Sequence, residues 1–315
     1  MSQCSSTTSE DCSRQLHGAD APAIRQAHPA AVICAVFLVL FWWASVFSTV
    51  RVSLKHFNPG ELAFLRLLIA TAFLGTYSIM ARMPAPGRRH WPRLVWIGAI
   101  GFAAYLTLLN LGQRTVEAGT ASFIVNTTPA ITAILAVVFL KERLKALGIL
   151  GIIVSLSGVG LILLSTQKGE ATDSISGGLF LICAALAHAI HFILQKATLR
   201  NLSPLQVTLG SMFIGTVCLL PFAGTALKAL LEAPVSAVMA VVYLGIFPSA
   251  LAHFTWSFVL SQMTVSKATN LLMLISPTAA IMGSVWLGEA TPAIAWCGGA
   301  LTILGVALVQ SKTGG

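Results

Sequence analysis

Charged residues are scarce in this chain of 315 residues, because Asp, Glu, Lys and Arg together make up 9% of it while hydrophobic residues make up 56%. A water-soluble globular protein carries about 25% charged residues, since its solvated surface needs them. A soluble fold of this composition would expose far too much apolar surface to water. The composition therefore excludes a water-soluble enzyme, and its hydrophobicity excludes an intrinsically disordered chain.

Several chemical motifs are also missing from the sequence. No Cys-x-x-Cys pair occurs among the six cysteines, so the spacing of a metal or redox site is absent. No Gly-x-x-x-x-Gly-Lys-Ser/Thr motif occurs, so ATP-driven pumping would need a partner protein. The net charge of +9 comes without a basic stripe interleaved with aromatic residues, so nucleic acid is not an expected partner. We predict no cofactor, no metal site and no catalytic residues.

Long apolar runs dominate the rest of the sequence. A bilayer core needs about 20 mostly apolar residues per helix, and the sequence contains ten such segments. They are Ala31–Val50, Leu62–Met80, Leu94–Leu111, Ala118–Leu140, Ala146–Leu164, Gly177–Leu194, Leu205–Phe222, Val235–Leu260, Val265–Leu287 and Pro292–Val309. We therefore predict an all-α integral membrane protein with ten transmembrane helices. Residues 1–28 are polar and without periodicity, which predicts a disordered cytoplasmic tail.

Lysine and arginine are unevenly distributed between the predicted loops. Twelve lie on the side of the N-terminal tail, and five lie on the opposite side. Because cytoplasmic loops carry the excess of basic residues, we expect both termini in the cytoplasm, which requires an even number of helices. The expected location is the inner or plasma membrane, with the lipid bilayer as a partner. The oligomeric state stays open.

The two halves of the chain resemble each other at an offset of 147 to 149 residues. Each half, residues 31–164 and 177–310, would contain five helices. An odd number of helices turns the second half over in the membrane, and such an inverted 5+5 repeat is typical of secondary transporters with a midplane cavity. The matched pieces are Val95–Gly98 with Val242–Gly245, Thr128–Pro129 with Ser276–Pro277, Lys141–Glu142 with Gly288–Glu289, and Gly158–Leu161 with Gly305–Leu308.

Short motifs occur in a fixed order along this apolar frame. They are Trp43-Ala44-Ser45, Pro59-Gly60-Glu61, Phe64-Leu65-Arg66, Ala118-Gly119-Thr120-Ala121, Pro129 and Lys141-Glu142-Arg143. Over about residues 30 to 310, this set resembles the EamA family of the drug/metabolite transporter superfamily. The resemblance implies an inverted ten-helix fold with a central cavity, lined mainly by helices 1, 3, 4, 6, 8 and 9, that exports or exchanges small metabolites. Helix 6 departs from the pattern, because His188 and His191 stand where such transporters often carry Trp and Tyr.

Polar and aromatic side chains within the spans are the candidates for substrate contact, because polar groups in hydrocarbon usually face a cavity or a partner. His188 and His191 share one helix face with Gln195. For each histidine, a hydrogen bond to a neighbouring helix is the alternative. No Asp or Glu occurs deep in a span, so these imidazoles are the available carriers if transport is coupled to protons. The predicted substrate-binding residues are Trp42, Trp43, Asn110, Gln113, Asn126, Thr127, His188, His191, His253, Trp256 and Asn270.

Two prolines and one arginine complete the set of candidates. Pro129 and Pro277 occupy the same repeat position, and each frees the carbonyl four residues earlier. We predict a matched pair of kinks that act in gating, the alternative being a purely structural bend. Arg66 enters four residues into its span, so it either snorkels to the interface or attracts a substrate carboxylate.

The function that fits these observations is a secondary transporter, an exporter of small metabolites with amino acids as the leading substrates. It works by alternating access through the cavity and is not an enzyme. A membrane-embedded lipid-modifying enzyme is one alternative, and it would need a nucleophile–base pair or metal cluster near one interface. The other alternative is a structural or receptor-like membrane protein, which would not need the inverted repeat.

Overall fold

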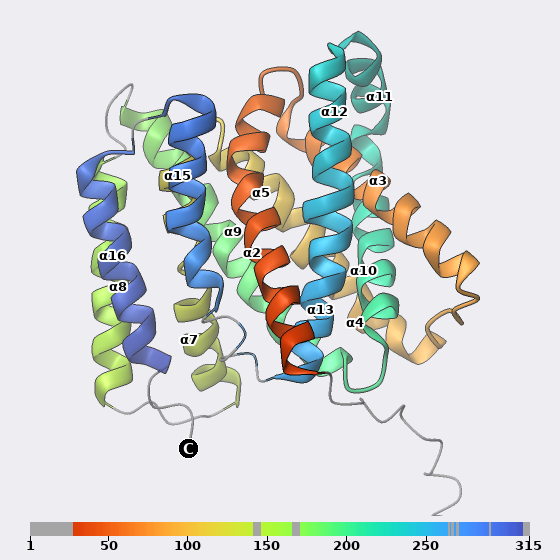
Figure 1. Cartoon of the computed structure of the whole chain (residues 1–315), viewed down its shortest axis with the longest axis horizontal. Helices are drawn as coiled ribbons and strands as arrows, with labels where there is room; N and C mark the ends of the chain where they lie inside the picture. The colour runs from red at the N-terminus through yellow and green to blue at the C-terminus, as the bar shows by residue number, and fades with distance from the viewer. Residues whose placement is uncertain are drawn as a thin grey trace, which may run out of the picture.

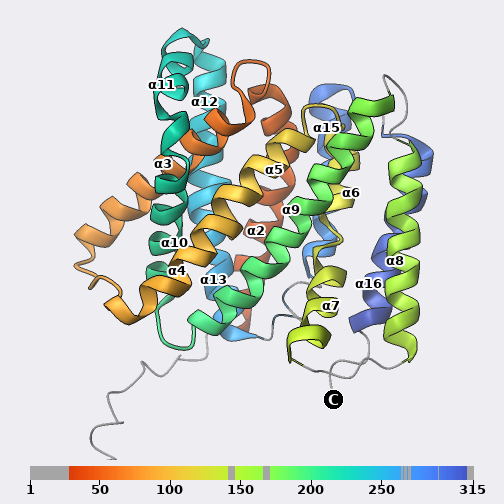
Figure 2. The same ribbon diagram turned by 180° about the vertical axis from the view of Figure 1, so that it is seen from behind.

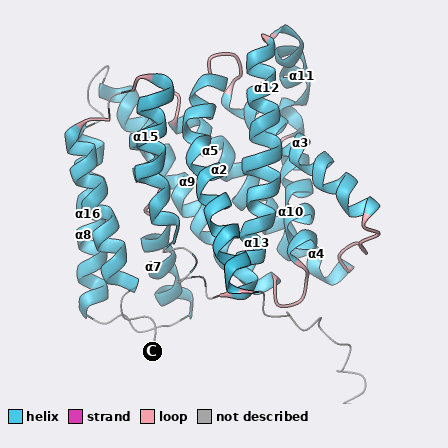
Figure 3. Ribbon diagram, viewed as in Figure 1, coloured by secondary structure: helices cyan, strands magenta, loops and turns pink. Residues whose placement is uncertain are grey.

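The computed structural model describes residues 28–140, 146–165, 171–263, 265, 268, 271–289 and 291–310. This part of the chain is helical and contains no strand (Figure 3). The elements are α2 (Pro29–Ser53), α3 (Pro59–Met80), η1 (Arg88–His90), α4 (Trp91–Gly98), η2 (Ala99–Ala104), α5 (Tyr105–Gly112), α6 (Ala118–Val125), α7 (Thr128–Leu140), α8 (Ala146–Ser165), α9 (Ala171–Thr198), α10 (Pro204–Cys218), η3 (Leu220–Phe222), α11 (Ala223–Glu232), α12 (Val235–Leu244), η4 (Gly245–Leu251), α13 (Ala252–Gln262), η5 (Leu272–Leu274), α15 (Ile275–Leu287) and α16 (Ala293–Gln310).

Five helical stretches among these residues are long and apolar enough to cross a membrane: Pro29–Ser53, Pro59–Met80, Arg88–Gly112, Ile175–Thr198 and Val235–Gln262. The pair Pro204–Cys218 and Leu220–Glu232, bent by 55°, would make a sixth span. Large apolar side chains such as Phe37, Ile79 and Trp286 lie exposed on the outer surface. A surface of this kind is stable against lipid and not against water.

The starts of α3 and α10 are built in the same way. Asn58 precedes Pro59 in α3, and the carboxylate of Glu61 accepts the backbone N–H of Asn58 at 2.9 Å. In α10, Ser203 and Gln206 form the same reciprocal pair, at 3.0 and 3.3 Å. Such capping boxes satisfy N–H groups that a helix start leaves unpaired.

The seventh apolar segment of the sequence ends at Phe222 and predicts a loop up to Val235, whereas the structure continues through η3 into α11. This helix is amphipathic. Ala226 is buried, and Lys228 and Glu232 form an exposed pair at 3.9 Å on the opposite side. A segment of only ten residues cannot cross a bilayer, so apolar length alone did not reveal it.

The helices form one bundle in which α2 begins and α16 ends at the same end (Figure 1). Helices α8 and α16 lie side by side at one edge, and both views show them away from the centre (Figures 1 and 2). These two helices correspond to the fifth and tenth predicted segments, which are not among the helices that the resemblance places around the cavity. Small residues permit the approach, because a Cβ on Gly158 would come within 2.5 Å of the Gly298 carbonyl oxygen.

We expect Gly158→Ala to destabilise this edge of the bundle. The added methyl group would overlap the backbone of α16, and overpacking of this kind costs about 1–3 kcal/mol. Gly160→Ala is the matched control, since nothing lies within 4 Å of the corresponding position. Thermal denaturation of the purified protein in detergent should show a lower melting temperature for Gly158→Ala only. Equal melting temperatures for the two variants would contradict the packing.

Candidate functional site

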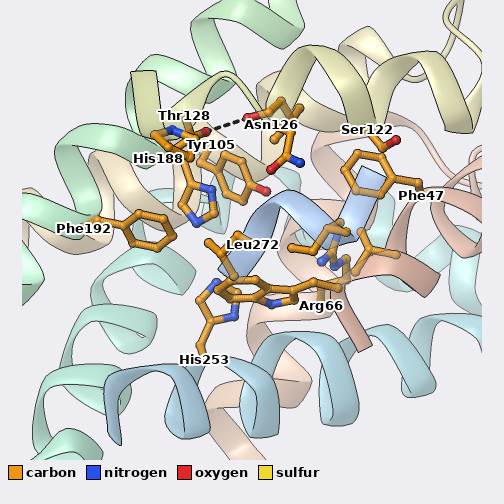
Figure 4. A pocket seen from close by; sticks show the side chains of 15 residues that line it. Phe47, Arg66, Tyr105, Ser122, Asn126, Thr128, His188, Phe192, His253 and Leu272 are labelled. Atoms are coloured by element: carbon orange, nitrogen blue, oxygen red, sulfur yellow. Dashed lines mark hydrogen bonds between the residues drawn. The ribbon is translucent and has the colours of Figure 1, made fainter. Parts of the chain in front are cut away.

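A cavity with a volume of about 40 Å³ lies in the middle of the bundle (Figure 4). Its walls come from α2, α3, α5, the α6–α7 junction, α9, α13 and the η5–α15 junction. These are the six helices that the resemblance implied, with α3 in addition. The lining residues are Trp43, Val46, Phe47, Arg66, Tyr105, Ser122, Val125, Asn126, Thr128, Pro129, His188, Phe192, His253, Leu272 and Ile275.

Aromatic rings form one wall of this cavity, with Trp43 at its centre. The Trp43 ring centroid lies 5.1 Å from that of His253, 5.8 Å from that of His188 and 5.4 Å from that of Trp256. The His188 ring stacks on Tyr105 with centroids 4.2 Å apart. Rings packed at these separations attract one another and resist displacement, so the wall is preformed.

The π-helical segment η4 positions two of these rings. A π turn leaves some carbonyls without their usual helical partner, and in η4 the Pro248 carbonyl accepts the Trp43 indole N–H at 3.2 Å. His253 Nδ1 lies 3.1 Å from the Pro248 oxygen and 3.0 Å from the Ser249 oxygen. Both neighbours are acceptors, so Nδ1 carries the proton, and in the neutral ring Nε2 is a hydrogen-bond acceptor.

The two prolines free carbonyls that other side chains then satisfy. The carbonyl four residues before Pro129 is that of Val125, which accepts the Thr128 hydroxyl at 2.7 Å. The corresponding carbonyl before Pro277 is that of Met273, which accepts the Asn126 amide at 3.1 Å. A hydroxyl and an amide group therefore satisfy the two carbonyls that the prolines leave unpaired. Asn126 joins the proline-containing segment of one half of the chain to that of the other.

A reciprocal pair of bonds joins α6 to α15 beside the same proline-containing segments. The Ser276 hydroxyl donates to the Ser122 carbonyl at 3.0 Å, and the Ser122 hydroxyl lies 3.4 Å from the Ser276 carbonyl. Both serines are buried. Small hydroxyl residues allow two membrane helices to approach closely and bond across the interface.

The structure brings some of the predicted site residues to the cavity and places others elsewhere. Trp43, Asn126, Pro129, His188 and His253 line it. His191, Trp256 and Thr127 are buried behind its wall. Pro277, on α15, is half-buried and is not one of the lining residues, and Asn270 lies outside the described residues.

Three predicted site residues do not line the cavity and instead contact neighbouring helices. The Asn110 amide donates to the Pro59 carbonyl at 2.9 Å, and the Gln113 amide donates to the Phe47 carbonyl at 2.9 Å. The Trp42 ring packs against Phe247, with centroids 6.0 Å apart. A mid-span amide must bond somewhere, and here the partner is a neighbouring helix.

The prediction missed Tyr105, Phe192 and Ser122 as lining residues, and it did not choose between two positions for Arg66. Tyr105 lies in the middle of an apolar segment, where a hydroxyl needs a partner or a cavity, so its position was a usable signal. Phe192 and Ser122 gave no such signal, because apolar rings and small hydroxyls are common in any membrane helix. In the described residues, no group of three or more His, Cys, Asp or Glu side chains is placed to hold a metal ion.

An ionic contact lies at the end of the bundle opposite to the start of α2 (Figure 1). The Arg51 guanidinium donates from Nε to Glu289 at 3.0 Å and from Nη1 to the Gln113 carbonyl at 2.9 Å. The other Glu289 oxygen accepts the Ala118 backbone N–H at 2.9 Å, at the first residue of α6. A carboxylate at a helix N-terminus is favoured by the helix dipole. We call Arg51, Glu289 and Ala118 the ionic clamp.

At the other end of the bundle, Lys196 makes contacts similar to those of Arg51. Its ammonium group donates to the carbonyls of Leu260 and, at 2.9 Å, Met263, at the end of α13. Arg51 contacts the Gln113 carbonyl and, at 3.2 Å, the Arg114 carbonyl, at the end of α5. A cation at a helix C-terminus satisfies carbonyls that have no intrahelical partner.

Comparison with known proteins gives the family of the chain. The profile of the EamA-like transporter family matches twice, over residues 30–164 and 175–311. The chain is 35% identical over 281 residues to a "Probable terminal-alkyne amino-acid exporter" of Streptantibioticus cattleyicolor, covering 89% of this chain and 94% of that protein. It is 32% identical to the "Uncharacterized transporter YdfC" of Bacillus subtilis, over 87% of this chain and 89% of that protein.

A solved crystal structure has the same fold, with a TM-score of 0.62 at 19% identity over 90% of this chain and 96% of its own. The double profile match and the relatives above 30% identity are decisive for the family, and the exposed apolar surface fits a multi-pass membrane protein. The chain therefore belongs to the EamA-like transporter family.

Proposed function

We propose that this protein is a secondary transporter that exports small metabolites, with amino acids as the leading substrates, by alternating access through the central cavity. The observation that carries the proposal is the composition of the cavity wall. Trp43 and Asn126 come from the first family match, and His188 and His253 come from the second. A site shared between two halves changes its access when the halves move relative to each other.

Ten transmembrane helices in an inverted 5+5 arrangement belong to this proposal. Matched features support the repeat, because capping boxes begin α3 and α10, and π turns interrupt the third helix of each half at η2 and η4. α2 begins and α16 ends at the same end of the bundle (Figure 1). With the excess of basic residues on that side, both termini lie in the cytoplasm in this proposal.

The cavity wall favours a small substrate with an apolar part. Rings of Trp43, Tyr105 and Phe192 offer an apolar surface, and the Asn126 amide and the histidine rings offer a few polar contacts. None of the described lining residues is acidic. Such a cavity suits a neutral or zwitterionic solute better than a cation, and the relative named as an amino-acid exporter points to the same class.

The ionic clamp joins the two halves of the chain at one end of the bundle. Glu289 holds the second half of the chain to the first through Arg51 and Ala118. In the proposed orientation this is the extracytoplasmic end. Export then requires the clamp to open after the substrate has entered from the cytoplasm.

Efflux from loaded proteoliposomes tests this function. The panel holds amino acids, including the terminal-alkyne amino acid 2-aminopent-4-ynoate, together with nucleosides and cationic drugs. We expect efflux of amino acids above protein-free liposomes. Efflux confined to nucleosides or cations would overturn the substrate class, and efflux of none would overturn the transporter assignment.

We expect His188→Ala and His253→Ala to weaken the apparent substrate affinity in this assay by about tenfold each. Each substitution removes a ring of the cavity wall, and a stacked ring pair contributes about 0.5–1.5 kcal/mol beyond its buried area. His56→Ala, on an exposed turn, is the control and should behave like the wild type. Unchanged affinity and selectivity in both cavity variants would show that the substrate does not contact this wall.

A further inference from the structure

Arg66 is a buried charge that has no carboxylate partner among the residues that the structure describes. Its side chain is 1% exposed, so it does not snorkel to the membrane interface. It lines the cavity, and Figure 4 shows it extending toward the space that Tyr105 and His253 also border. A charged group in this position is costly unless it has a partner or a ligand.

The protein contacts of Arg66 satisfy little of its hydrogen-bonding capacity. A guanidinium group has five N–H donors. Nη2 lies 3.4 Å from the Ser249 hydroxyl, and Nε and Nη1 have no partner within the part of the chain that the structure describes. The ion pairs described in this chain, Arg51 with Glu289 and Lys228 with Glu232, lie elsewhere.

From this geometry we infer that Arg66 binds the carboxylate group of the transported solute, an assignment that rests on the proposed function and specifies its substrate class. A planar guanidinium matches the two oxygens of a carboxylate in a bidentate pair. Trp43 and Phe192 then offer the apolar wall for the rest of the solute. Substrates are zwitterions or monoanions with an apolar side chain, and amines without a carboxylate are excluded.

Binding to the purified full-length protein in neutral detergent tests this inference without requiring transport. The probes share one side chain: leucine and 4-methylpentanoate carry the carboxylate, whereas leucinamide and 3-methylbutylamine lack it. The terminal-alkyne amino acid 2-aminopent-4-ynoate and its amide form a second series. We expect the carboxylates to bind at least tenfold more tightly, because a hydrogen-bonded charge contributes about that factor or more.

Variants of Arg66 separate recognition of the carboxylate from a structural role. Arg66→Gln should weaken binding of the carboxylates at least tenfold, leave the amides unchanged and so abolish the discrimination. Arg66→Lys keeps the charge but loses the planar fork, and should discriminate at an intermediate level. Lys196→Gln is the control, since it removes a positive charge outside the cavity. A purely structural Arg66 would instead lower binding of both probe classes equally.

Several results would overturn the inference. They are equal binding of acid and amide by the wild type, discrimination that persists in Arg66→Gln, and absence of binding by every carboxylate. If Arg66→Gln does not fold, the inference is tested by the binding of acid and amide probes to the wild type and to Arg66→Lys. Displacement of the probes by phosphatidylglycerol at micromolar concentration would assign Arg66 to a lipid phosphate in place of a solute. Carboxylate binding without efflux would contradict the proposed function and leave the inference standing.

Discussion

Trp43→Ala is expected to lower the free energy of unfolding by about 3–5 kcal/mol and to weaken substrate affinity at least tenfold. The cost of the cavity left by a buried indole is of this size, and Trp43 is 7% exposed with four rings around it. The loss also leaves the Pro248 carbonyl without its indole partner. Denaturation in detergent measures the first effect, and binding of the transported solute measures the second.

Two further variants show whether the binding effect is specific. Trp43→Phe keeps most of the packing while losing the bond to Pro248, so it should fold and bind with an intermediate loss. Trp42→Ala removes the neighbouring indole, which packs on Phe247 and does not line the cavity. We expect Trp42→Ala to keep its affinity within about twofold. A larger loss of affinity in Trp42→Ala than in Trp43→Ala would show that the solute binds on the Trp42 face of α2 and not in the cavity.

Glu289→Ala is expected to expose the cavity from the clamped end. The substitution removes the bonds to Arg51 and to the start of α6, and each charge-assisted bond contributes about 1.5–3 kcal/mol. A shift of that size changes the population of the open form about tenfold or more. The measurement is the labelling rate of a cysteine at Phe47, a cavity-lining position, by a membrane-impermeant maleimide added outside cells.

The second ion pair of the described chain provides the control for this experiment. Lys228 and Glu232 are 78% and 69% exposed, so their pair is screened by solvent and contributes little. Lys228→Ala should therefore leave the labelling of Phe47→Cys unchanged. Equal labelling rates for Glu289→Ala and the wild type would mean that the clamp does not hold the closed form.

Apolar length was enough to predict the five long apolar helical stretches, though not α11, because a membrane helix must satisfy its backbone internally over about 20 residues. It could not reveal the π turns at η2 and η4, since one extra residue in a turn hardly changes hydropathy. Pro248, inside an apolar run, was the available signal for η4. The 5+5 repeat and the cytoplasmic termini stay predictions.

The site was harder to predict, because it depends on which face of each helix turns inward. His188 and His191 share a helix face, yet only His188 lines the cavity, while His191 packs over Gly101, where a Cβ would overlap its ring. The burial of Arg66 depends on the contact between α3 and η4, which no local pattern encodes. Asn110 and Gln113 are amide side chains within predicted spans, like Asn126, but they bond to neighbouring helices away from the cavity.

The contacts of Arg51 and Lys196 have a consequence for how the molecule moves. Arg51 ties α2 to the end of α5, and Lys196 ties α9 to the end of α13, so each tether lies inside one half of the chain. Neither tether has to break when one half tilts against the other. In the proposed mechanism, the contacts that have to change are those that join the two halves, such as the bonds of Glu289 to Arg51 and of Asn126 to the Met273 carbonyl.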